Sequence, residues 1–398
     1  MKPLAGGIKL EGKKEATLTP WSSVRPSPPR LVRIPLETQK GSVAQSLVEP
    51  GERVRLGQKI AEGARGVGLH ASVSGPVTKV STFIEIHSDG KDEPVSDLGH
   101  ERRNWQALSK TEIRQILKES GVDLPHHAGT RLILNACESE PYLTSDHSLL
   151  MTHPVEILRA AEILNLLFEP REVILATEDN KEEVIELLKS KVFFHTWSRT
   201  RIKVLPSRYP QEDESILSRT LLGPGQEATV IPVWMTYAIY EAVVLQKSFY
   251  ERIVTIAGEC VAQPRNFWIR IGTLVEEAVK YARGFLRKPE RVILGGPMHG
   301  RALPSLDVPV LKDTRGILGL PSEVVRPESV EPCIRCGRCL ESCPVSISPA
   351  MITLAAEKEL FDLALDYGAR LCIECGNCSY VCPAKRPMVE LIRYANAH

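Results

Sequence analysis

Cysteine placement is the feature that most limits what this chain can fold into and bind. Eight of the ten cysteines lie between Cys333 and Cys382, in two copies of the spacing C-x2-C-x2-C-x3-C-P. The first copy comprises Cys333, Cys336, Cys339 and Cys343, and the second comprises Cys372, Cys375, Cys378 and Cys382. This repeated spacing is typical of bacterial ferredoxins that carry two clusters. We therefore predict two [4Fe-4S] clusters in the last part of the chain.

In such ferredoxins the fourth cysteine of each copy binds the cluster of the other copy. We therefore assign the first cluster to Cys333, Cys336, Cys339 and Cys382. The second cluster is assigned to Cys372, Cys375, Cys378 and Cys343. Structural zinc is the alternative, but zinc takes four ligands as two pairs and would leave cysteines of this repeat unused. Two clusters with no open coordination site predict an electron relay.

Composition and charge limit the remaining possibilities. The chain has 398 residues, enough for two to four domains, and its 43% hydrophobic and 25% charged content is typical of soluble globular proteins. Fifty basic and 49 acidic side chains give no electrostatic reason to expect nucleic acid as a partner. The first residues lack the apolar run of a signal peptide. We therefore expect a reducing cytosol, where thiols are free or bound to metal.

One apolar stretch approaches the length of a membrane span, from Ala228 to Leu245. Pro232 and Glu241 interrupt it. We predict a buried strand followed by a core helix at this place, and no transmembrane segment.

The order of local patterns predicts a multidomain α/β chain. Five prolines between Pro20 and Pro35 predict an extended arm. Short apolar runs with glycine turns follow and resemble the barrel-sandwich fold of lipoyl and biotinyl carriers, without the modified lysine motif of those carriers. Alternating helices and strands then predict a parallel, doubly wound, Rossmann-like sheet, and the next segment resembles a β-grasp ligand-binding module. The expected bounds are 1–35 for the arm, 36–100 for the barrel-sandwich domain, 105–247 for the flavoprotein-like α/β domain, 248–300 for the β-grasp module, 301–330 for a linker and 331–398 for the α-helical dicluster ferredoxin domain.

Two local predictions depend on single residues. His70 lies beside a predicted hairpin, and we expect it to be a surface or turn residue rather than a ligand. Between the two cysteine motifs, Ser348 and Pro349 mark the start and Gly368 the end of a stretch that we predict to be one helix.

The motifs NACESEPYLTSD, GECVAQPRNFWIRIGT and GGPMHG, followed by the paired cysteine motifs, resemble the RnfC family of the Rnf complex, an ion-translocating ferredoxin:NAD oxidoreductase. The resemblance implies a peripheral electron-transfer subunit on the cytoplasmic side of the inner (plasma) membrane. Its partners would be membrane subunits of an Rnf-type complex and ferredoxin or another electron carrier. Three alternatives remain: an FMN-dependent NADH dehydrogenase subunit, a corrinoid reductase of the same architecture, and a structural adaptor with non-redox clusters.

The resemblance also implies an FMN and NADH site in the sheet domain. The residues that match its polar positions are Asn135, Glu138, Glu140, Asp146 and Glu214. Other elements of the family's site are missing: the glycine-rich phosphate loop is replaced by a stretch with His126 and His127, and Glu212 stands where the family has a glycine. Pro232 and Met235 replace an amide and a hydroxyl side chain. We therefore predict a degenerate site that binds FMN or NADH weakly.

Overall fold

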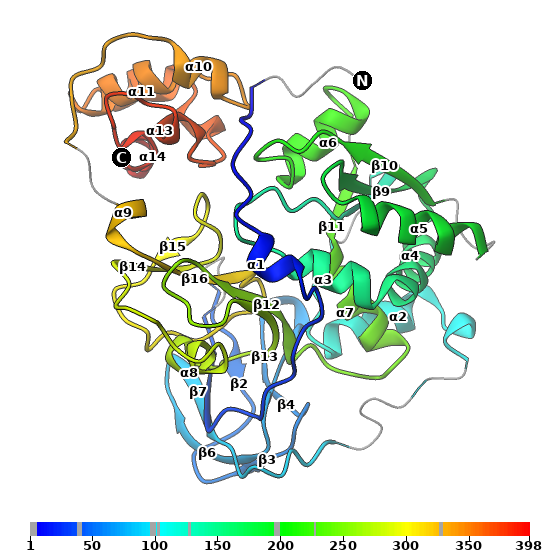
Figure 1. Ribbon diagram of the computed structural model, residues 1–398. Helices are drawn as coiled ribbons and strands as arrows, with labels where there is room; N and C mark the ends of the chain where they lie inside the picture. The colour runs from blue at the N-terminus through cyan, green and yellow to red at the C-terminus, as the bar shows by residue number, and fades with distance from the viewer. Residues whose placement is uncertain are drawn as a thin grey trace.

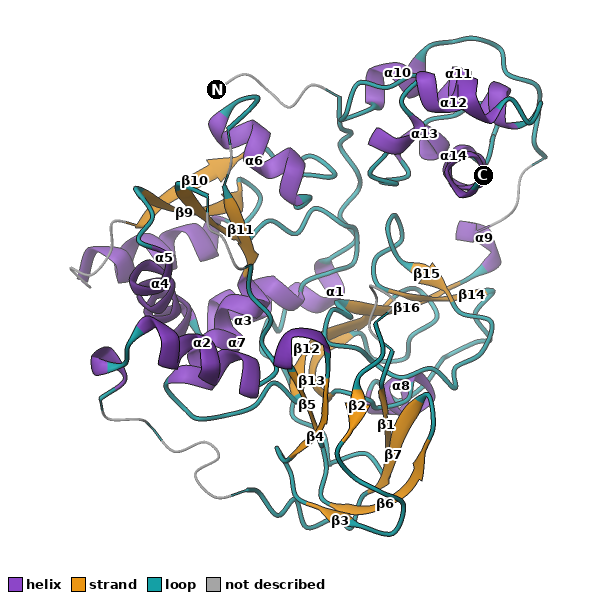
Figure 2. Ribbon diagram, turned by 180° about the vertical axis from the view of Figure 1, so that it is seen from behind, coloured by secondary structure: helices purple, strands orange, loops and turns teal. Residues whose placement is uncertain are grey.

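The structure is a computed structural model that describes residues 6–37, 42–95, 101, 104–125, 129–194, 200–226, 228–325 and 329–398. Figure 1 shows a helical C-terminal domain at the top, an α/β domain to the right, a mixed sheet to the left and a β domain at the bottom. The view from behind shows the same arrangement with left and right exchanged (Figure 2). The N-terminal segment runs down through the middle of the molecule. Within the described residues, no helix has the length and apolar character needed to cross a bilayer.

The β domain consists of two small sheets around a shared apolar core. One sheet has the order β1-β7-β6-β3 and the other has the order β2-β4-β5. The strands are β1 (Leu31–Pro35), β2 (Gln45–Ser46), β3 (Arg53–Val54), β4 (Lys59–Glu62), β5 (Gly68–His70), β6 (Gly75–Val80) and β7 (Phe83–His87). Residues 31–35 were expected in the arm, but Val32 and Ile34 alternate into this core, so β1 belongs to the domain.

The α/β domain has a four-stranded parallel sheet of order β10-β9-β8-β11. The strands are β8 (Arg131–Asn135), β9 (Glu172–Glu178), β10 (Thr200–Leu205) and β11 (Thr229–Pro232). One face packs on α2 (Lys110–Glu119), α4 (Pro154–Phe168), α5 (Glu182–Phe194) and α7 (Val233–Val243). The other face packs on α6 (Glu214–Leu222), and α3 (Ser145–Thr152) follows the end of β8. The predicted doubly wound sheet is confirmed, as are the strand and core helix within 228–245.

The third domain is a mixed sheet of order β13-β12-β16-β14-β15. Its elements are β12 (Glu251–Ala257), β13 (Arg265–Arg270), α8 (Val275–Tyr281), β14 (Arg291–Leu294), β15 (Arg301–Ala302) and β16 (Gly316–Leu320), followed by α9 (Ser322–Val325). The predicted linker of 301–330 therefore differs from the structure. Residues 316–320 form a fully buried strand between β12 and β14, since their backbone pairs with both neighbours.

The C-terminal domain is helical. It contains α10 (Arg338–Ser342), α11 (Pro349–Ala356), α12 (Phe361–Asp366), α13 (Asn377–Tyr380) and α14 (Met388–Ala397). The single helix predicted between the cysteine motifs is wrong: α11 ends at Ala356, and Glu359 has a φ of 56°, which no α-helix allows. A short 3-10 turn, η3 (Ala369–Leu371), lies between α12 and α13, and two others, η1 (Ala64–Gly66) and η2 (Trp105–Ala107), lie earlier in the chain.

The N-terminal segment connects the C-terminal domain to the α/β domain. The Gly7 N–H donates to the Ser342 carbonyl at 3.0 Å, and Ile8 forms a two-bond bridge with Tyr209. Gly6 has a φ of +74°, and a Cβ there would lie 2.3 Å from the Cys343 carbonyl oxygen. A side chain at Gly6 would therefore push the N-terminal segment away from the C-terminal domain. Further along, α1 (Glu15–Leu18) lies against β12 and β13.

Candidate metal centres and the adjoining cavity

The two cysteine motifs fold into matching loops. The residue before the second cysteine of each motif, Arg335 or Glu374, has a φ of 56° or 55°. The glycine after that cysteine, Gly337 or Gly376, has a φ of 80° or 78°. The repeat in sequence is therefore also a repeat in backbone conformation. Each glycine immediately precedes a short helix, α10 or α13, that carries the third cysteine.

Two separate cavities lie inside these loops, and each is lined by four cysteines. One cavity has Cys333, Cys336, Cys339 and Cys382 in its wall. The other has Cys343, Cys372, Cys375 and Cys378. In each case three cysteines come from one motif and the fourth comes from the other motif. These are the two sets expected from crossed ligation.

The surroundings of the cysteines suit a metal cluster. The remaining wall of the second cavity is mainly apolar, with Val345, Ile347, Ile373 and Ile392 among its residues. Burial raises the pKa of the Cys375 and Cys378 thiols to about 12, so as free groups they would stay protonated at neutral pH. Bound iron supplies the positive charge that makes such thiols thiolates. The Glu374 N–H also points at the Cys372 sulfur at 3.3 Å, as amides do around cluster sulfurs.

A third cavity, of about 600 Å³, lies at the carboxyl-end side of the α/β sheet. Glu140, Glu212, Glu214 and the 295–300 turn line it. Tyr209 and His299 connect this region with the loop of the second cysteine set. The buried Tyr209 hydroxyl donates to the Cys375 carbonyl at 2.8 Å and lies 2.8 Å from His299 Nδ1. Nε2 of His299 lies 3.3 Å from the Ile373 carbonyl oxygen.

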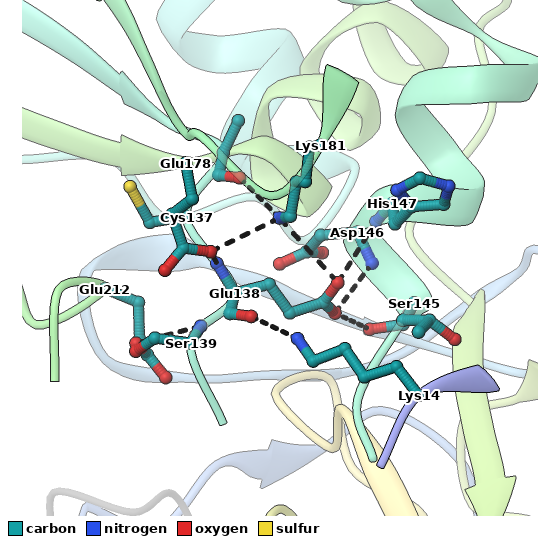
Figure 3. Close-up of polar contacts among 12 residues, drawn as sticks. Lys14, Cys137, Glu138, Ser139, Ser145, Asp146, His147, Glu178, Lys181 and Glu212 are labelled. Carbon is teal, nitrogen blue, oxygen red and sulfur yellow. Dashed lines mark hydrogen bonds and ion pairs between the residues drawn. The ribbon is translucent and has the colours of Figure 1, made fainter. Parts of the chain in front are cut away.

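Most polar residues predicted for the flavin site form hydrogen bonds or ion pairs with other groups of the protein. Figure 3 shows the Glu138 carboxylate accepting bonds from the Ser145 hydroxyl and from the N–H groups at the start of α3. Lys181 Nζ lies 4.0 Å from the same carboxylate, and Lys14, from the N-terminal segment, donates to the Glu138 carbonyl. Burial alone would raise the pKa of Glu138, but Lys181, Lys14 and Arg315 bring it to about 2. Glu138 is therefore a buried structural anion.

The other predicted residues have similar roles. Asn135 donates to the Glu212 carbonyl at 2.8 Å and accepts from the Cys137 N–H at 3.1 Å. The Glu140 carboxylate accepts from the N–H groups of Met298 and His299 at 3.0 and 3.1 Å.

Two more predicted residues lie nearby. Asp146 lies 3.3 Å from Arg315. Glu214 begins α6 and lines the 600 Å³ cavity together with Glu140. His126 and His127 lie outside the described residues.

The charge of the 600 Å³ cavity does not suit a phosphate group. Its wall has more carboxylates, Glu140, Glu212, Asp213, Glu214 and Asp313, than cations, Arg301 and Arg315. Burial raises the pKa of Glu212 to about 7, with Arg315 acting against the rise. Phosphate binding normally depends on a surplus of N–H donors and cations. The residues present therefore do not fit tight binding of FMN or NADH.

Sequence reasoning missed the cations and the aromatic contact of this region. Lys14, Lys181 and Arg315 come from three separate segments, and no local pattern marks them. His299 lies in the motif GGPMHG and Tyr209 lies three residues before Glu212, but their contact with the Cys375 loop depends on how the domains pack.

Comparison with protein families matches four consecutive parts of the chain. Residues 2–95 match the RnfC barrel sandwich hybrid domain, and residues 119–245 match the Nuo51 FMN-binding domain. Residues 253–302 match the SLBB domain, and residues 329–386 match the 4Fe-4S dicluster domain. Fold and site thus define a multidomain iron-sulfur electron-transfer protein with two [4Fe-4S] clusters on a flavoprotein-like scaffold. The predicted fold class is confirmed.

Curated relatives narrow this class to one family. The RnfC component of the proton-translocating ferredoxin:NAD(+) oxidoreductase complex of Clostridium ljungdahlii is 33% identical over 99% of this chain and 93% of its own length. The corresponding component of the ion-translocating oxidoreductase complex of Yersinia pestis is 32% identical, over 87% of this chain and 61% of its own length. The chain belongs to the RnfC family.

Related folds are found among solved structures. A chain of the NAD+-reducing [NiFe]-hydrogenase in the air-oxidized state superposes with a TM-score of 0.51 and 17% identity, covering 71% of this chain and 63% of its own. At this identity the match concerns the fold alone.

Proposed function

We propose that this chain is a peripheral electron-transfer subunit of an Rnf-type ion-translocating complex, attached to membrane subunits on the cytoplasmic side of the inner membrane. It relays single electrons through two [4Fe-4S] clusters. The observation that carries this proposal is the pair of cavities, each lined by three cysteines of one motif and one of the other. We assign the first cluster to Cys333, Cys336, Cys339 and Cys382. The second cluster belongs to Cys372, Cys375, Cys378 and Cys343.

The two clusters have different surroundings, which suggests an order along the relay. The second set of cysteines adjoins Tyr209 and His299 and so faces the interior of the protein. The first set lies near the surface: Cys336 is exposed, and Ile334 in the wall of its cavity is 67% exposed. Exposed Leu340 and Met351 lie on the adjoining helices α10 and α11. We infer that the first cluster exchanges electrons with a partner carrier such as ferredoxin at this apolar surface.

A second candidate is an NADH dehydrogenase subunit with FMN in the α/β domain. The match of residues 119–245 to an FMN-binding domain and the 600 Å³ cavity favour it. Two observations favour the relay without flavin. The cavity wall has more carboxylates than cations, and the Glu138 and Glu140 carboxylates already accept hydrogen bonds from backbone N–H groups.

Metal analysis and reduction test the proposal. Anaerobically purified protein should contain about eight irons and eight acid-labile sulfides. Dithionite or reduced ferredoxin should reduce both clusters. Two tightly bound zinc ions without iron-sulfur absorbance would refute the cluster assignment, and clusters that neither reductant reduces would indicate a structural adaptor instead.

A further inference from the structure

A relay of two clusters needs two points of electron exchange, one for each cluster. The proposed function gives the first cluster a partner at the surface around Ile334. The second cluster adjoins the α/β domain, whose 600 Å³ cavity does not fit tight binding of FMN or NADH. The second cluster therefore needs a partner outside the protein, and the surface closest to its cysteines is the place to look for one.

Helices α12 and α14 pack directly on the second cysteine set. They lie side by side in the C-terminal domain (Figure 2). Their inner faces share one apolar cluster with Cys343 and Cys372. The helix residues of this cluster include Phe361, Ala364, Leu365, Leu391, Ile392 and Ala395. A partner on the outer face of these helices would therefore be about one helix diameter, ~10 Å, from the second cluster.

The outer face of the two helices carries exposed apolar side chains. Leu360 is 50% exposed, and Leu363, one turn further along α12, is 40% exposed. Tyr394 of α14 is also 40% exposed, and its ring contacts that of Phe361 edge to face with centroids 5.4 Å apart. We call Leu360, Phe361, Leu363 and Tyr394 the α12 surface. Neighbouring exposed apolar side chains of this kind mark protein interaction sites.

The charge beside the α12 surface is mainly negative. Asp362 and Asp366 are exposed and four residues apart, so they flank Leu363 on the outer side of α12. The segment 357–366 has four carboxylates and one lysine, Lys358. On α14, Arg393 is already paired with Glu374. An apolar centre with an acidic rim fits a partner whose own rim is basic.

We propose, on the basis of the relay described above, that the α12 surface docks on the cytoplasmic face of the membrane subunits of the complex and that the second cluster exchanges electrons there. Cytoplasmic loops of membrane proteins carry an excess of Lys and Arg, which complements Asp362 and Asp366. A bare lipid surface does not fit, because the cytoplasmic leaflet is itself anionic and repels carboxylates. The first cluster is thereby left for the soluble carrier.

Cosedimentation tests the docking. Membranes from cells that make the complex without this chain should bind the added wild-type protein. Asp362→Lys/Asp366→Lys turns two attractive charges into repulsive ones and should weaken this binding about tenfold or more. Glu182→Lys/Glu186→Lys makes the same charge change at the same spacing on the exposed side of α5, and it should bind like the wild type. Both variants should keep the wild-type cluster absorbance, which shows that they are folded.

Reduction of cytochrome c, a basic one-electron acceptor, tests the electron exchange. The protein is first reduced with dithionite, and the excess is removed. One electron then passes from a reduced cluster to the ferric haem, which becomes ferrous. The wild-type rate should fall as the salt concentration rises. Asp362→Lys/Asp366→Lys should lower the rate at low salt about tenfold, and Glu182→Lys/Glu186→Lys should not.

Three results would each overturn the docking proposal and leave the relay intact. They are wild-type membrane binding by Asp362→Lys/Asp366→Lys, the same cytochrome c rate in both double variants, and equally strong binding of the wild-type protein to protein-free anionic vesicles. Failure of the proposed function gives a different result, which would overturn both: clusters that neither dithionite nor ferredoxin reduces, in a protein that does not bind the membranes of the complex.

Discussion

The Tyr209 hydroxyl donates a 2.8 Å hydrogen bond to the backbone carbonyl of Cys375, a residue 166 positions later in the chain. Tyr209 thereby joins the α/β domain to the loop of the second cysteine set. The His299 ring lies against the same hydroxyl. The backbone N–H of His299 donates to the Glu140 carboxylate in the wall of the 600 Å³ cavity. We therefore expect the second cluster, and not the first, to respond to changes in the α/β domain.

Tyr209→Phe should alter the second cluster and leave the first unchanged. Loss of the hydroxyl removes the positive end of a dipole near the second cluster, and this destabilises its reduced, more negative state. We expect its reduction potential to fall by tens of millivolts, the equivalent of about 1 kcal/mol for one hydrogen bond. A redox titration followed by electron paramagnetic resonance measures this. Tyr394→Phe, on the exposed side of α14, should have no effect, and equal shifts of both clusters in Tyr209→Phe would contradict the assignment.

Substitution of the two fourth cysteines tests the crossed ligation. Cys343→Ser should perturb the cluster held by Cys372, Cys375 and Cys378. Cys382→Ser should perturb the cluster held by Cys333, Cys336 and Cys339. Each variant is the control for the other, and resonance spectra of the reduced proteins distinguish the two clusters. Damage confined to the motif that carries the substitution would show uncrossed ligation.

A charge near the first cluster should slow exchange with a partner carrier. Ile334→Glu places a carboxylate in the exposed apolar surface and should reduce the rate of reduction by ferredoxin about tenfold, by interrupting an apolar contact. Reduction by dithionite, a small molecule, should proceed at the wild-type rate. Leu286→Glu, on a similarly exposed leucine of the mixed-sheet domain, is the matched control. If both variants react normally with ferredoxin, docking occurs elsewhere.

Glu212 should make the protein less stable as the pH rises. Burial raises its pKa to about 7 in the folded state, against about 4.3 in the unfolded chain. Between these values the folded state holds more protons, so the free energy of unfolding decreases as the pH rises from 5 to 8, by on the order of 2 kcal/mol. Urea unfolding at several pH values measures this. Glu212→Gln should flatten the dependence, whereas Glu186→Gln, at an exposed position, should retain it.

The parts of this protein that could be predicted from sequence have local signals. The cysteine spacing alone indicated two clusters, and alternating apolar strands and amphipathic helices indicated the parallel sheet. Residues 316–320 were assigned to a linker because GILGL is a short run whose strand character depends on pairing with β12 and β14. His70 was placed at the surface because the residues that cover it, Glu119, Gly121 and Lys312, belong to other domains.

The state of the flavin-like site depends on similar distant contacts. The motif NACESEPYLTSD could be recognised in the sequence. The sequence does not show that its polar side chains bind other groups of the protein. Lys14 reaches Glu138 from 124 residues earlier in the chain, and Arg315 reaches Asp146 from 169 residues later. Only the packed structure shows that Lys14 donates to the Glu138 carbonyl and that Arg315 pairs with the Asp146 carboxylate.

Addition of FMN and NADH to the purified protein tests the central claim, a cluster relay without its own flavin chemistry, most directly. We predict that FMN binds no more tightly than a Kd of tens of micromolar, because several charge-assisted hydrogen bonds to phosphate are missing. NADH should not bleach the cluster absorbance, and Glu140→Gln should leave dithionite-driven reduction nearly unchanged. Stoichiometric FMN in the native protein, or rapid bleaching by NADH that Glu140→Gln abolishes, would contradict the account and identify a dehydrogenase.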